Sequence, residues 1–278
     1  MSTEDGKRLE TRLLSQTTKA CADFDLLRDG DHVAVAISGG KDSYTLLHLL
    51  MQLQRRAPFS FALTAVNLDQ CQPGFDAVRI EAHLRAVGVS YVMLKDDTYA
   101  TVTATVEPGK TMCWMCGRLR RAVLYSAAVG LGCNKIALGH HRDDLIESLL
   151  MSAFYAGVLK SMPAKLKSDD GRNTIIRPMV YCAEGEIAAF AAAKKFPIVP
   201  CNLCGNQPDL KRKRVKKLLD ELEAENSNVK ANLLHALGAV VPAHLLDRRL
   251  YDFAAMAPVD PRPAEASSRP ALPIVLDA

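Results

Sequence analysis

The residue types best suited to binding an anion lie in one turn, Ser38-Gly39-Gly40-Lys41-Asp42-Ser43. The apolar run 33–37 before it predicts a buried parallel strand, and the stretch 43–56 after it predicts an amphipathic helix. Glycines at such a junction let backbone N–H groups approach a phosphate closely, and the helix N-terminus adds the positive end of its dipole. Lys41 supplies a point charge, and Ser38 and Ser43 supply hydroxyl donors. The turn therefore predicts a phosphate-binding loop.

This loop is not a Walker A motif, because that motif has a glycine five residues before Gly40, where this chain has Val35. Ser-Gly-Gly-Lys-Asp-Ser after a buried strand instead resembles the pyrophosphate loop of the N-type ATP pyrophosphatases. The resemblance implies cleavage of ATP to AMP and pyrophosphate while a carbonyl oxygen is activated as its adenylate. The alternative is an ordinary glycine turn, which leaves six matching residues in the right context unexplained.

The eight cysteines supply the second candidate site. Four are isolated and are expected to be small buried hydrophobic residues, namely Cys21, Cys71, Cys133 and Cys182. The others form two C-x-x-C pairs, Cys113/Cys116 and Cys201/Cys204. A disulfide framework is not expected in a cytoplasmic chain, so the pairs indicate structural zinc, a redox dithiol or persulfide carrier, or an iron–sulfur cluster. Spacing alone leaves zinc and the cluster open, and buried thiols paired by chance are the fourth alternative.

A polar segment follows a later expected strand, Gly139-His140-His141-Arg142-Asp143-Asp144. Asp42 and either Asp143 or Asp144 are candidate catalytic carboxylates that would position a Mg²⁺ ion on the ATP phosphates. The alternative role of the Asp pair is to cap the helix that begins near residue 142. His140 and His141 could contact the nucleotide or the base, or pack at the end of the strand.

The strongest electrostatic feature is a basic run, Lys211–Lys217, with six positive charges in seven residues. Three further arginines follow the first cysteine pair, namely Arg118, Arg120 and Arg121. Phosphate backbones bind such patches through counterion release, and we interpret the run as an RNA contact. The alternative is a solvated helix face that acidic residues between 220 and 225 partly balance.

Strands and helices alternate over the first 160 residues, which predicts an α/β fold with a doubly wound parallel sheet. The expected strands are 33–37, 61–67, 90–95 and 134–138, and the expected helices are 7–28, 43–56, 74–87, 117–131 and 142–156. Ligands of such sheets bind beyond the carboxyl ends of the strands, where the Ser38 loop, Asn67–Asp69 and Gly139–Asp144 would lie. Beyond residue 160 we expect a loop with one short strand at 174–177, then helices at 184–195, 209–224, 228–239 and 243–253.

Composition sets broader limits. The chain has 278 residues, 49% apolar composition and a net charge of +4, enough for a sizeable core. It has no apolar run of membrane-spanning length, and its start is polar, which favours a soluble cytoplasmic protein without a membrane partner. We expect an N-terminal helix (1–28), an ATP pyrophosphatase domain (29–200), a C-terminal helical region (201–256) and a disordered Pro-rich tail (257–278).

Five separated motifs together resemble the tRNA-cytidine 2-sulfurtransferase family over about residues 10–253. They are Ser38–Ser43, Cys113–Arg121, Leu138–Asp144, Ile176–Pro178 and Phe196–Gly205. The resemblance implies an adenine nucleotide α-hydrolase-like fold with extra N- and C-terminal helices. It also implies an oxygen-sensitive [4Fe-4S] cluster held by three cysteines, Cys113, Cys116 and Cys204, with Cys201 as the alternative third ligand.

The implied reaction uses ATP and Mg²⁺ to thiolate a cytidine at position 32 of a tRNA anticodon loop. The C2 oxygen attacks the α-phosphorus of ATP, and sulfide delivered on the cluster then replaces the adenylated oxygen and expels AMP. An open iron suits such delivery, whereas a fourth thiolate ligand would close the site. The resemblance further suggests a homodimer, with a cysteine desulfurase as the sulfur source.

Two classes of alternative remain. Within the same superfamily, lysidine synthetases share the loop and a His-Asp-Asp segment but have no use for these cysteines, and a cluster-bearing tRNA 2-thiouridine synthetase is a closer rival. Outside it, the chain could be a zinc-stabilised RNA-binding module with a vestigial loop. The intact Ser38, Lys41 and Asp42 argue against such decay.

Overall fold

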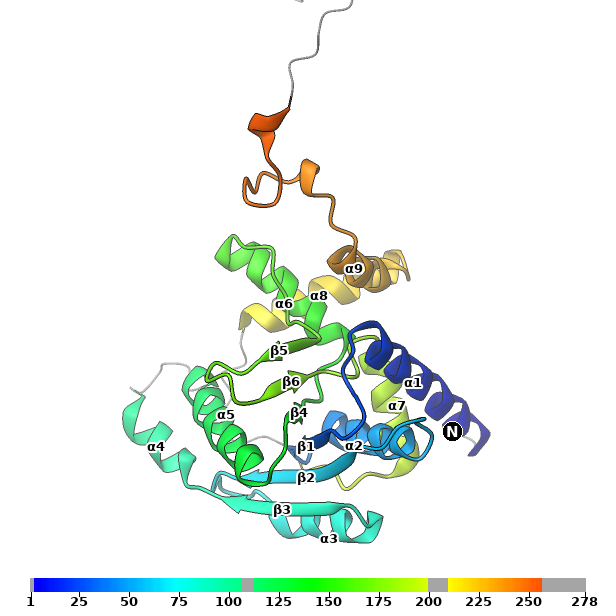
Figure 1. Ribbon diagram of the computed structural model, residues 1–278, viewed down its shortest axis with the longest axis vertical. Coiled ribbons are helices and arrows are strands. Elements are labelled where there is room, and N and C mark those ends of the chain that lie inside the picture. Colours follow the sequence, from blue (N-terminus) through cyan, green and yellow to red (C-terminus); the bar gives the residue numbers. More distant parts are fainter. Residues whose placement is uncertain (1–2, 107–112, 200–209, 257–278) are drawn as a thin grey trace, which may run out of the picture. The chain divides into compact units, whose positions relative to one another are not determined.

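The structure is a computed structural model that describes residues 3–106, 113–199 and 210–256 (Figure 1). The chain divides into two compact units, Met1–His235 and Ala236–Ala278. The expected Pro-rich tail, 257–278, lies outside the described residues, and the domain boundaries expected at 28, 200 and 256 stay predictions. Among the described residues, no helix combines the length and the apolar character needed to cross a bilayer.

A six-stranded sheet in the order β3-β2-β1-β4-β6-β5 forms the centre of the first unit. Its strands are β1 (His32–Ile37), β2 (Ala62–Asp69), β3 (Ser90–Lys95), β4 (Lys135–Ala137), β5 (Lys165–Lys167) and β6 (Thr174–Ile176). All neighbouring pairs are parallel except β5, which pairs antiparallel with β6 at one edge. The chain runs from β1 to β2 on one side and later enters β4 on the other, so the topological switch point lies between β1 and β4. The doubly wound α/β prediction is confirmed.

Nine α-helices are present in the described part of the chain. They are α1 (Thr3–Asp23), α2 (Lys41–Gln54), α3 (Ala77–Val87), α4 (Thr98–Thr105), α5 (Cys113–Gly130), α6 (Arg142–Ala156), α7 (Glu184–Lys194), α8 (Leu210–Glu225) and α9 (Val229–Gly238). Most lie within a few residues of the expected ranges. Helix α4 and strand β5 were not predicted, and α5 begins four residues earlier than expected, so the first cysteine pair lies in its first turn.

One helix prediction was wrong at its end, and another was wrong over its whole length. The helix expected to reach residue 28 stops at Asp23, because Asp25 has φ = +48° and the buried Leu26 turns into the core. The helix expected at 243–253 is replaced by two 3₁₀ turns, Pro242–His244 and Phe253–Ala255. There the Asp252 carboxylate accepts the N–H groups of residues 254 and 255, a local bond that competes with the helix ladder.

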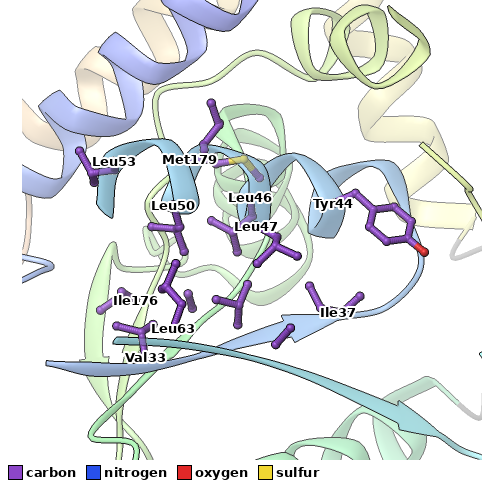
Figure 2. Close-up of a cluster of buried hydrophobic side chains, with 14 of the residues drawn as sticks. Val33, Ile37, Tyr44, Leu46, Leu47, Leu50, Leu53, Leu63, Ile176 and Met179 are labelled. Atoms are coloured by element: carbon purple, nitrogen blue, oxygen red, sulfur yellow. The ribbon is translucent and has the colours of Figure 1, made fainter. Parts of the chain in front are cut away.

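The core has two layers, one on each face of the sheet. Val33, Val35 and Ile37 of β1 pack against α2, and Figure 2 shows the leucines of α2 lying over this strand. Residues of α1, α3 and α7 complete that layer. On the other face, Ala34 packs with Leu124 and other residues of α5. The alternation of side chains along β1 therefore holds its carboxyl end, and the loop after it, between two helical layers.

A buried ion pair links the amino ends of β1 and β4. Lys135 Nζ donates to Asp31 Oδ2 (2.5 Å) and to the Leu26 carbonyl oxygen (2.9 Å), and both charged side chains are less than 10% exposed. Burial raises the pKa of the Asp31 carboxyl, but bonds from Lys135 and Asn134 outweigh it and lower the pKa. Neither charge can therefore be removed without leaving the other buried and unpaired.

We expect Lys135→Ala to lower the free energy of unfolding by about 3–5 kcal/mol, because it leaves the Asp31 carboxylate without its cation. Urea denaturation followed by circular dichroism measures this loss. Lys19→Ala is the control, since Lys19 forms an exposed i, i+4 pair with Asp23 (2.5 Å), and its effect should be small. Equal losses in the two variants would contradict the buried role of Lys135.

Candidate active site

The loop 38–43 leaves β1 at the switch point, and its shape depends on Gly39. Gly39 has φ = +81°, and a Cβ built on it would lie 2.9 Å from Ile80 Cδ1 and 3.2 Å from Val199 Cβ. The Val199 N–H donates to the Gly39 carbonyl oxygen at 2.9 Å, so the segment after α7 holds the loop from behind. Below the loop, the buried Asn67 Nδ2 donates to the Ile37 carbonyl oxygen (2.8 Å) and fixes the strand end.

Gly39→Ala is expected to weaken binding of an ATP analogue at least tenfold, because the left-handed φ costs about 1–3 kcal/mol and the new Cβ pushes the loop from its seat. Isothermal titration calorimetry measures the affinity. The matched control is Gly88→Ala, because Gly88 has a similar φ of +73° but a Cβ added there would meet no atom within 4 Å. Both variants should lose stability, and only the first should lose nucleotide. Equal nucleotide affinities would show that the loop tolerates the side chain.

The two serines and the start of α2 supply the hydrogen-bond donors of the loop. Ser38 Oγ donates to Ser43 Oγ at 3.3 Å, and Ser43 Oγ donates to the Gly40 carbonyl oxygen at 2.9 Å. Gly40 is the N-cap of α2 and has no side chain. The N-cap residue therefore accepts no hydrogen bond through a side chain from the first N–H groups of the helix. This is the arrangement that binds phosphate oxygens at a helix N-terminus.

Lys41 lies at the loop between two carboxylates. Its Nζ is 2.9 Å from Asp42 Oδ1 and 3.3 Å from Glu184 Oε1, the latter at the first residue of α7. Burial lowers the pKa of Lys41, but Asp42 and Glu184 outweigh burial and raise it above its ordinary value. Lys41 therefore stays positively charged, as a ligand for phosphate must.

The segment 139–144 meets this loop at the end of β4. A Cβ on Gly139 would lie 3.2 Å from the carbonyl carbon of Asp42, so the two backbones approach closely. His141 is the N-cap of α6, and its N–H donates to Asp144 Oδ2 at 3.0 Å. The His141 ring brings two of the predicted carboxylates together, with Nε2 3.7 Å from Asp42 Oδ1 and 3.5 Å from Asp144 Oδ2.

Asp143 points elsewhere. It is buried, and its Oδ2 accepts the N–H of Glu184 at 2.9 Å, which caps the start of α7. Its Oδ1 lies 3.7 Å from Lys230 Nζ. Both acidic residues therefore cap a helix, as the alternative interpretation predicted. Asp144 caps α6, the helix to which it belongs, whereas Asp143 caps α7. Of the three predicted catalytic carboxylates, the structure brings Asp42 and Asp144 together.

The carboxylates at the loop fit the needs of a magnesium ion that binds together with a nucleotide. Among the described residues, no group of three His, Cys, Asp or Glu side chains could hold a metal ion alone. Mg²⁺ on nucleotides usually takes only one or two carboxylates, with phosphate oxygens and waters filling its other positions. Asp42 and Asp144 match that requirement. His141 Nδ1 is buried beside them without a hydrogen-bond partner in the described part of the chain.

His140 packs against Arg177, the arginine of the Ile-Arg-Pro motif at the end of β6. Arg177 Nε donates to His140 Nδ1 at 3.2 Å, and Arg177 Nη1 donates to the Pro163 carbonyl oxygen at 2.6 Å. Burial and then the charge of Arg177 lower the pKa of His140 to about 4. His140 is therefore neutral near pH 7 and accepts a hydrogen bond, which is the packed alternative for this residue.

The His140–Arg177 contact predicts a loss of stability in acid. An unfolded histidine binds its proton near pH 6.5, whereas folded His140 does so only near pH 4, so the unfolded state binds more protons in between. Stability contributed by the neutral ring should therefore fall from pH 6.5 toward pH 4. Between pH 7.5 and 5 we expect the wild type to lose about 2 kcal/mol more than His140→Asn, measured by urea denaturation. Parallel pH profiles would contradict this assignment.

The first cysteine pair lies at the neighbouring strand end. Cys113 is the first residue of α5, and the half-buried Cys116 Sγ accepts a hydrogen bond from Gln70 Nε2 at 3.4 Å. Gln70 directly follows β2 and also donates to Thr98 Oγ1 at 2.8 Å. Cys116 thus lies at the carboxyl edge of the sheet that also carries the loop. Cys201 and Cys204 lie outside the described residues, so the third ligand stays a prediction.

The isolated cysteines differ in burial. Cys133 and Cys182 are buried as predicted, and burial raises the pKa of Cys182 to about 12. Cys21 is half-buried against the core, and burial raises its thiol pKa to about 12 as well. The prediction was wrong for Cys71, which is half-buried at a turn with φ = +60° and belongs to neither core layer.

The basic run lies in the first half of α8, which packs against α6 through Ile146, Val215 and Leu219. Lys216 Nζ lies 2.6 Å from Glu184 Oε2, and Arg212 Nε lies 3.4 Å from Glu147 Oε2. Lys213 and Arg214 are exposed and have no carboxylate partner among the described residues. Two charges of the run therefore pair with carboxylates of α6 and α7, and all six basic side chains are exposed and open to a polyanion.

Three residues of this edge, Glu184, Arg177 and Gln70, were not predicted to have a role at the site. Arg177 belongs to a motif, and Gln70 directly follows β2, a position at which ligand-binding residues of such sheets lie. Glu184 carries only the ordinary signal of an acidic residue in a first helical turn. Its contacts depend on how α2, α7 and α8 pack.

A glycine-containing loop at the switch point, with a lysine and two carboxylates around it, defines a PP-loop protein. The PP-loop domain family matches residues 9–221, so the chain belongs to that family. A tRNA-cytidine(32) 2-sulfurtransferase of Anaeromyxobacter dehalogenans (strain 2CP-C) is 65% identical over 88% of this chain and 84% of its own. Another, from Cupriavidus taiwanensis, is 52% identical over 90% of this chain and 81% of its own. The chain is thus a member of the tRNA-cytidine(32) 2-sulfurtransferase family.

A solved structure supports the fold. The U34-tRNA thiolase NcsA from Methanococcus maripaludis, determined with its [4Fe-4S] cluster, aligns with a TM-score of 0.68 over 85% of this chain and 81% of its own. The two sequences are 21% identical, so this likeness concerns the arrangement of the sheet and helices. It agrees with the expected adenine nucleotide α-hydrolase-like fold.

Proposed function

We propose that this protein is a sulfurtransferase that uses ATP to thiolate C2 of cytidine 32 in tRNA. The observation that carries the proposal is the 65% identity, over 88% of the chain, to a tRNA-cytidine(32) 2-sulfurtransferase. The geometry of the loop supports the ATP-dependent half-reaction, because a charged lysine, two serine hydroxyls and a helix N-terminus meet at one strand end. We infer that cytidine thiolation accounts for this chain better than uridine thiolation or a non-enzymatic RNA-binding module, because the similar relatives are cytidine(32) 2-sulfurtransferases.

In the proposed reaction, the ATP phosphates bind the loop 38–43 and draw Lys41 away from Asp42 and Glu184. The C2 oxygen of cytidine attacks the α-phosphorus, pyrophosphate leaves, and the oxygen becomes part of a good leaving group. Sulfide then attacks C2, and the C2–O bond breaks to release AMP. Lys41 and the N–H groups of α2 stabilise the charge that develops on the phosphates. Asp42 and Asp144 would hold a Mg²⁺ ion, which would supply positive charge against the phosphates, and Asp143 would support the site by capping α7.

We propose that Cys113, Cys116 and Cys204 hold a [4Fe-4S] cluster, with Cys201 as the alternative to Cys204. Cys116 suits this role, because it lies in a first helical turn that has no acidic residue, and the side-chain amide of Gln70 donates to its sulfur. When bound, such a cluster supplies an iron without a protein ligand, where sulfide can be held. Gln70 would hydrogen-bond the thiolate of Cys116 and orient it.

The proposed partners follow from this chemistry. The exposed lysines and arginines of α8 would contact the tRNA backbone, with Lys213 and Arg214 free of carboxylate partners in the described residues. A cysteine desulfurase would supply the sulfur. We further propose a homodimer in the cytoplasm.

The adenylation step can be tested without sulfur transfer. Purified protein is incubated with ATP labelled at the α-phosphate, Mg²⁺ and tRNA that carries cytidine at position 32, and AMP and pyrophosphate are quantified. We expect nucleotide turnover that requires the tRNA and falls to background when cytidine 32 is replaced by adenosine. Turnover that is indifferent to this base, or absent with every tRNA, would contradict the proposed substrate.

A further inference from the structure

Glu184 connects the ATP loop to the basic helix. Its Oε1 lies 3.3 Å from Lys41 Nζ, and its Oε2 lies 2.6 Å from Lys216 Nζ. Each carboxylate oxygen therefore holds a different lysine, one from the phosphate-binding loop and one from the basic run of α8. These two lysines are 175 positions apart in the sequence, and the one carboxylate lies between them.

The position of Glu184 is fixed independently of both lysines. Its backbone N–H donates to the buried Asp143 at 2.9 Å, and it is the first residue of α7, where the helix dipole favours a negative charge. Its side chain is 27% exposed. Burial raises the pKa of Glu184, but Lys216 and Lys41 outweigh burial and lower the pKa to about 2. The carboxylate is thus charged at every physiological pH.

We infer that Glu184 couples the two ligand sites of the protein, so that nucleotide phosphates at the loop and RNA phosphates on α8 weaken each other's binding. This inference rests on the proposed function, which supplies the RNA. It concerns a positioning residue, because Glu184 acts through Lys41 and Lys216.

The two ligands should oppose each other, because Glu184 has one lysine partner at each ligand site. ATP phosphates attract Lys41 away from Glu184, and Lys216 still compensates the carboxylate. RNA phosphates attract Lys216, which is 47% exposed, and Lys41 still compensates it. When both ligands bind, the half-buried carboxylate loses both cations, and an unpaired charge away from water is costly. This cost arises only when both ligands are bound. Thermodynamic linkage therefore requires that each ligand weaken the binding of the other by the same factor.

Fluorescence anisotropy of a labelled anticodon stem-loop RNA, with and without a saturating non-hydrolysable ATP analogue and Mg²⁺, measures the coupling. We expect the analogue to weaken RNA binding by wild type about fivefold or more, which is at the lower end of typical allosteric coupling. In Glu184→Gln the two RNA affinities should be equal. Glu186→Gln is the matched control, because it removes the same charge from the same helical turn, where Glu186 pairs with Arg12 at 2.8 Å. It should keep the wild-type ratio.

A second measurement needs no RNA. In Lys216→Gln, Glu184 retains only Lys41, so ATP-analogue binding should weaken about fivefold, and this effect should vanish in the Glu184→Gln background. Lys213→Gln is the control for the loss of one positive charge from α8, because Lys213 has no carboxylate partner among the described residues. It should leave the affinity for the ATP analogue unchanged.

The outcomes separate the inference from the proposed function. RNA binding by wild type with no coupling, or with a coupling that Glu184→Gln retains, overturns the inference and leaves the proposed function intact. An effect of Lys216→Gln that persists in the double variant overturns it as well. Wild type that binds the analogue but no RNA overturns the proposed function, and the coupling to RNA with it.

Discussion

Cys116→Ala is expected to abolish both iron binding and thiolation of tRNA while leaving the ATP loop intact. Loss of an outer-shell group at a metal site costs about 10–100-fold in affinity or activity, so loss of a direct ligand should cost more than about 100-fold. Cys116 is half-buried at the start of α5, with its sulfur hydrogen-bonded by Gln70, whereas Lys41 and Asp42 belong to a different strand end. The two sites should therefore fail separately.

The measurement combines iron content after anaerobic purification, 2-thiocytidine in tRNA, and affinity for an ATP analogue. Cys133→Ala is the matched control, since Cys133 is a buried thiol in the layer beneath α5 and lies outside both cysteine pairs. It should retain iron and activity. Full iron and thiolation in Cys116→Ala would remove this residue from the ligand set, and zinc in place of iron in the wild type would favour a structural metal site.

Lys41→Met should reduce tRNA-dependent AMP release about 100- to 1,000-fold, which is the range for removing one group that stabilises developing charge. The substitution keeps most of the side-chain volume but leaves Asp42 and Glu184 facing the phosphates without the ammonium group between them. Both the affinity for ATP and the rate of adenylation should suffer.

Initial rates of AMP formation at saturating tRNA measure the effect, and Lys167→Met is the control because Lys167 is exposed at the end of β5. Thermal unfolding of Lys41→Met should stay close to wild type, since Glu184 keeps Lys216 as a partner and Met fills a similar volume. A rate within about threefold of wild type would mean that the loop binds phosphate through backbone groups alone.

The fold was predictable where the signals are local. Apolar runs located β1 and β2, and the pair Gly39-Gly40 marked the loop, where the close approach of Ile80 and Val199 excludes a side chain at Gly39. The edge strand β5 was missed because three residues with lysines at both ends carry no apolar pattern. The helix expected at 243–253 was wrong because carboxylates such as Asp252 satisfy backbone N–H groups locally.

The candidate site was predictable in its residue types but not in its pairings. The sequence indicated that Asp143 and Asp144 were equivalent, and only packing separates them, since Asp143 caps α7 while Asp144 joins Asp42 around His141. The division of Glu184 between Lys41 and Lys216 depends on how three helices, α2, α7 and α8, pack together. No spacing rule connects residues that far apart in the chain.

Mass spectrometry of tRNA nucleosides from cells with and without this gene tests the central claim most directly. We expect the deletion to remove 2-thiocytidine and no other thionucleoside, and we expect the wild-type gene to restore it while the Cys116→Ala gene does not. Unchanged 2-thiocytidine in the deletion strain would contradict the account. In that case, loss of a different thionucleoside would reassign the base, and an unaltered nucleoside profile would reject the enzymatic role.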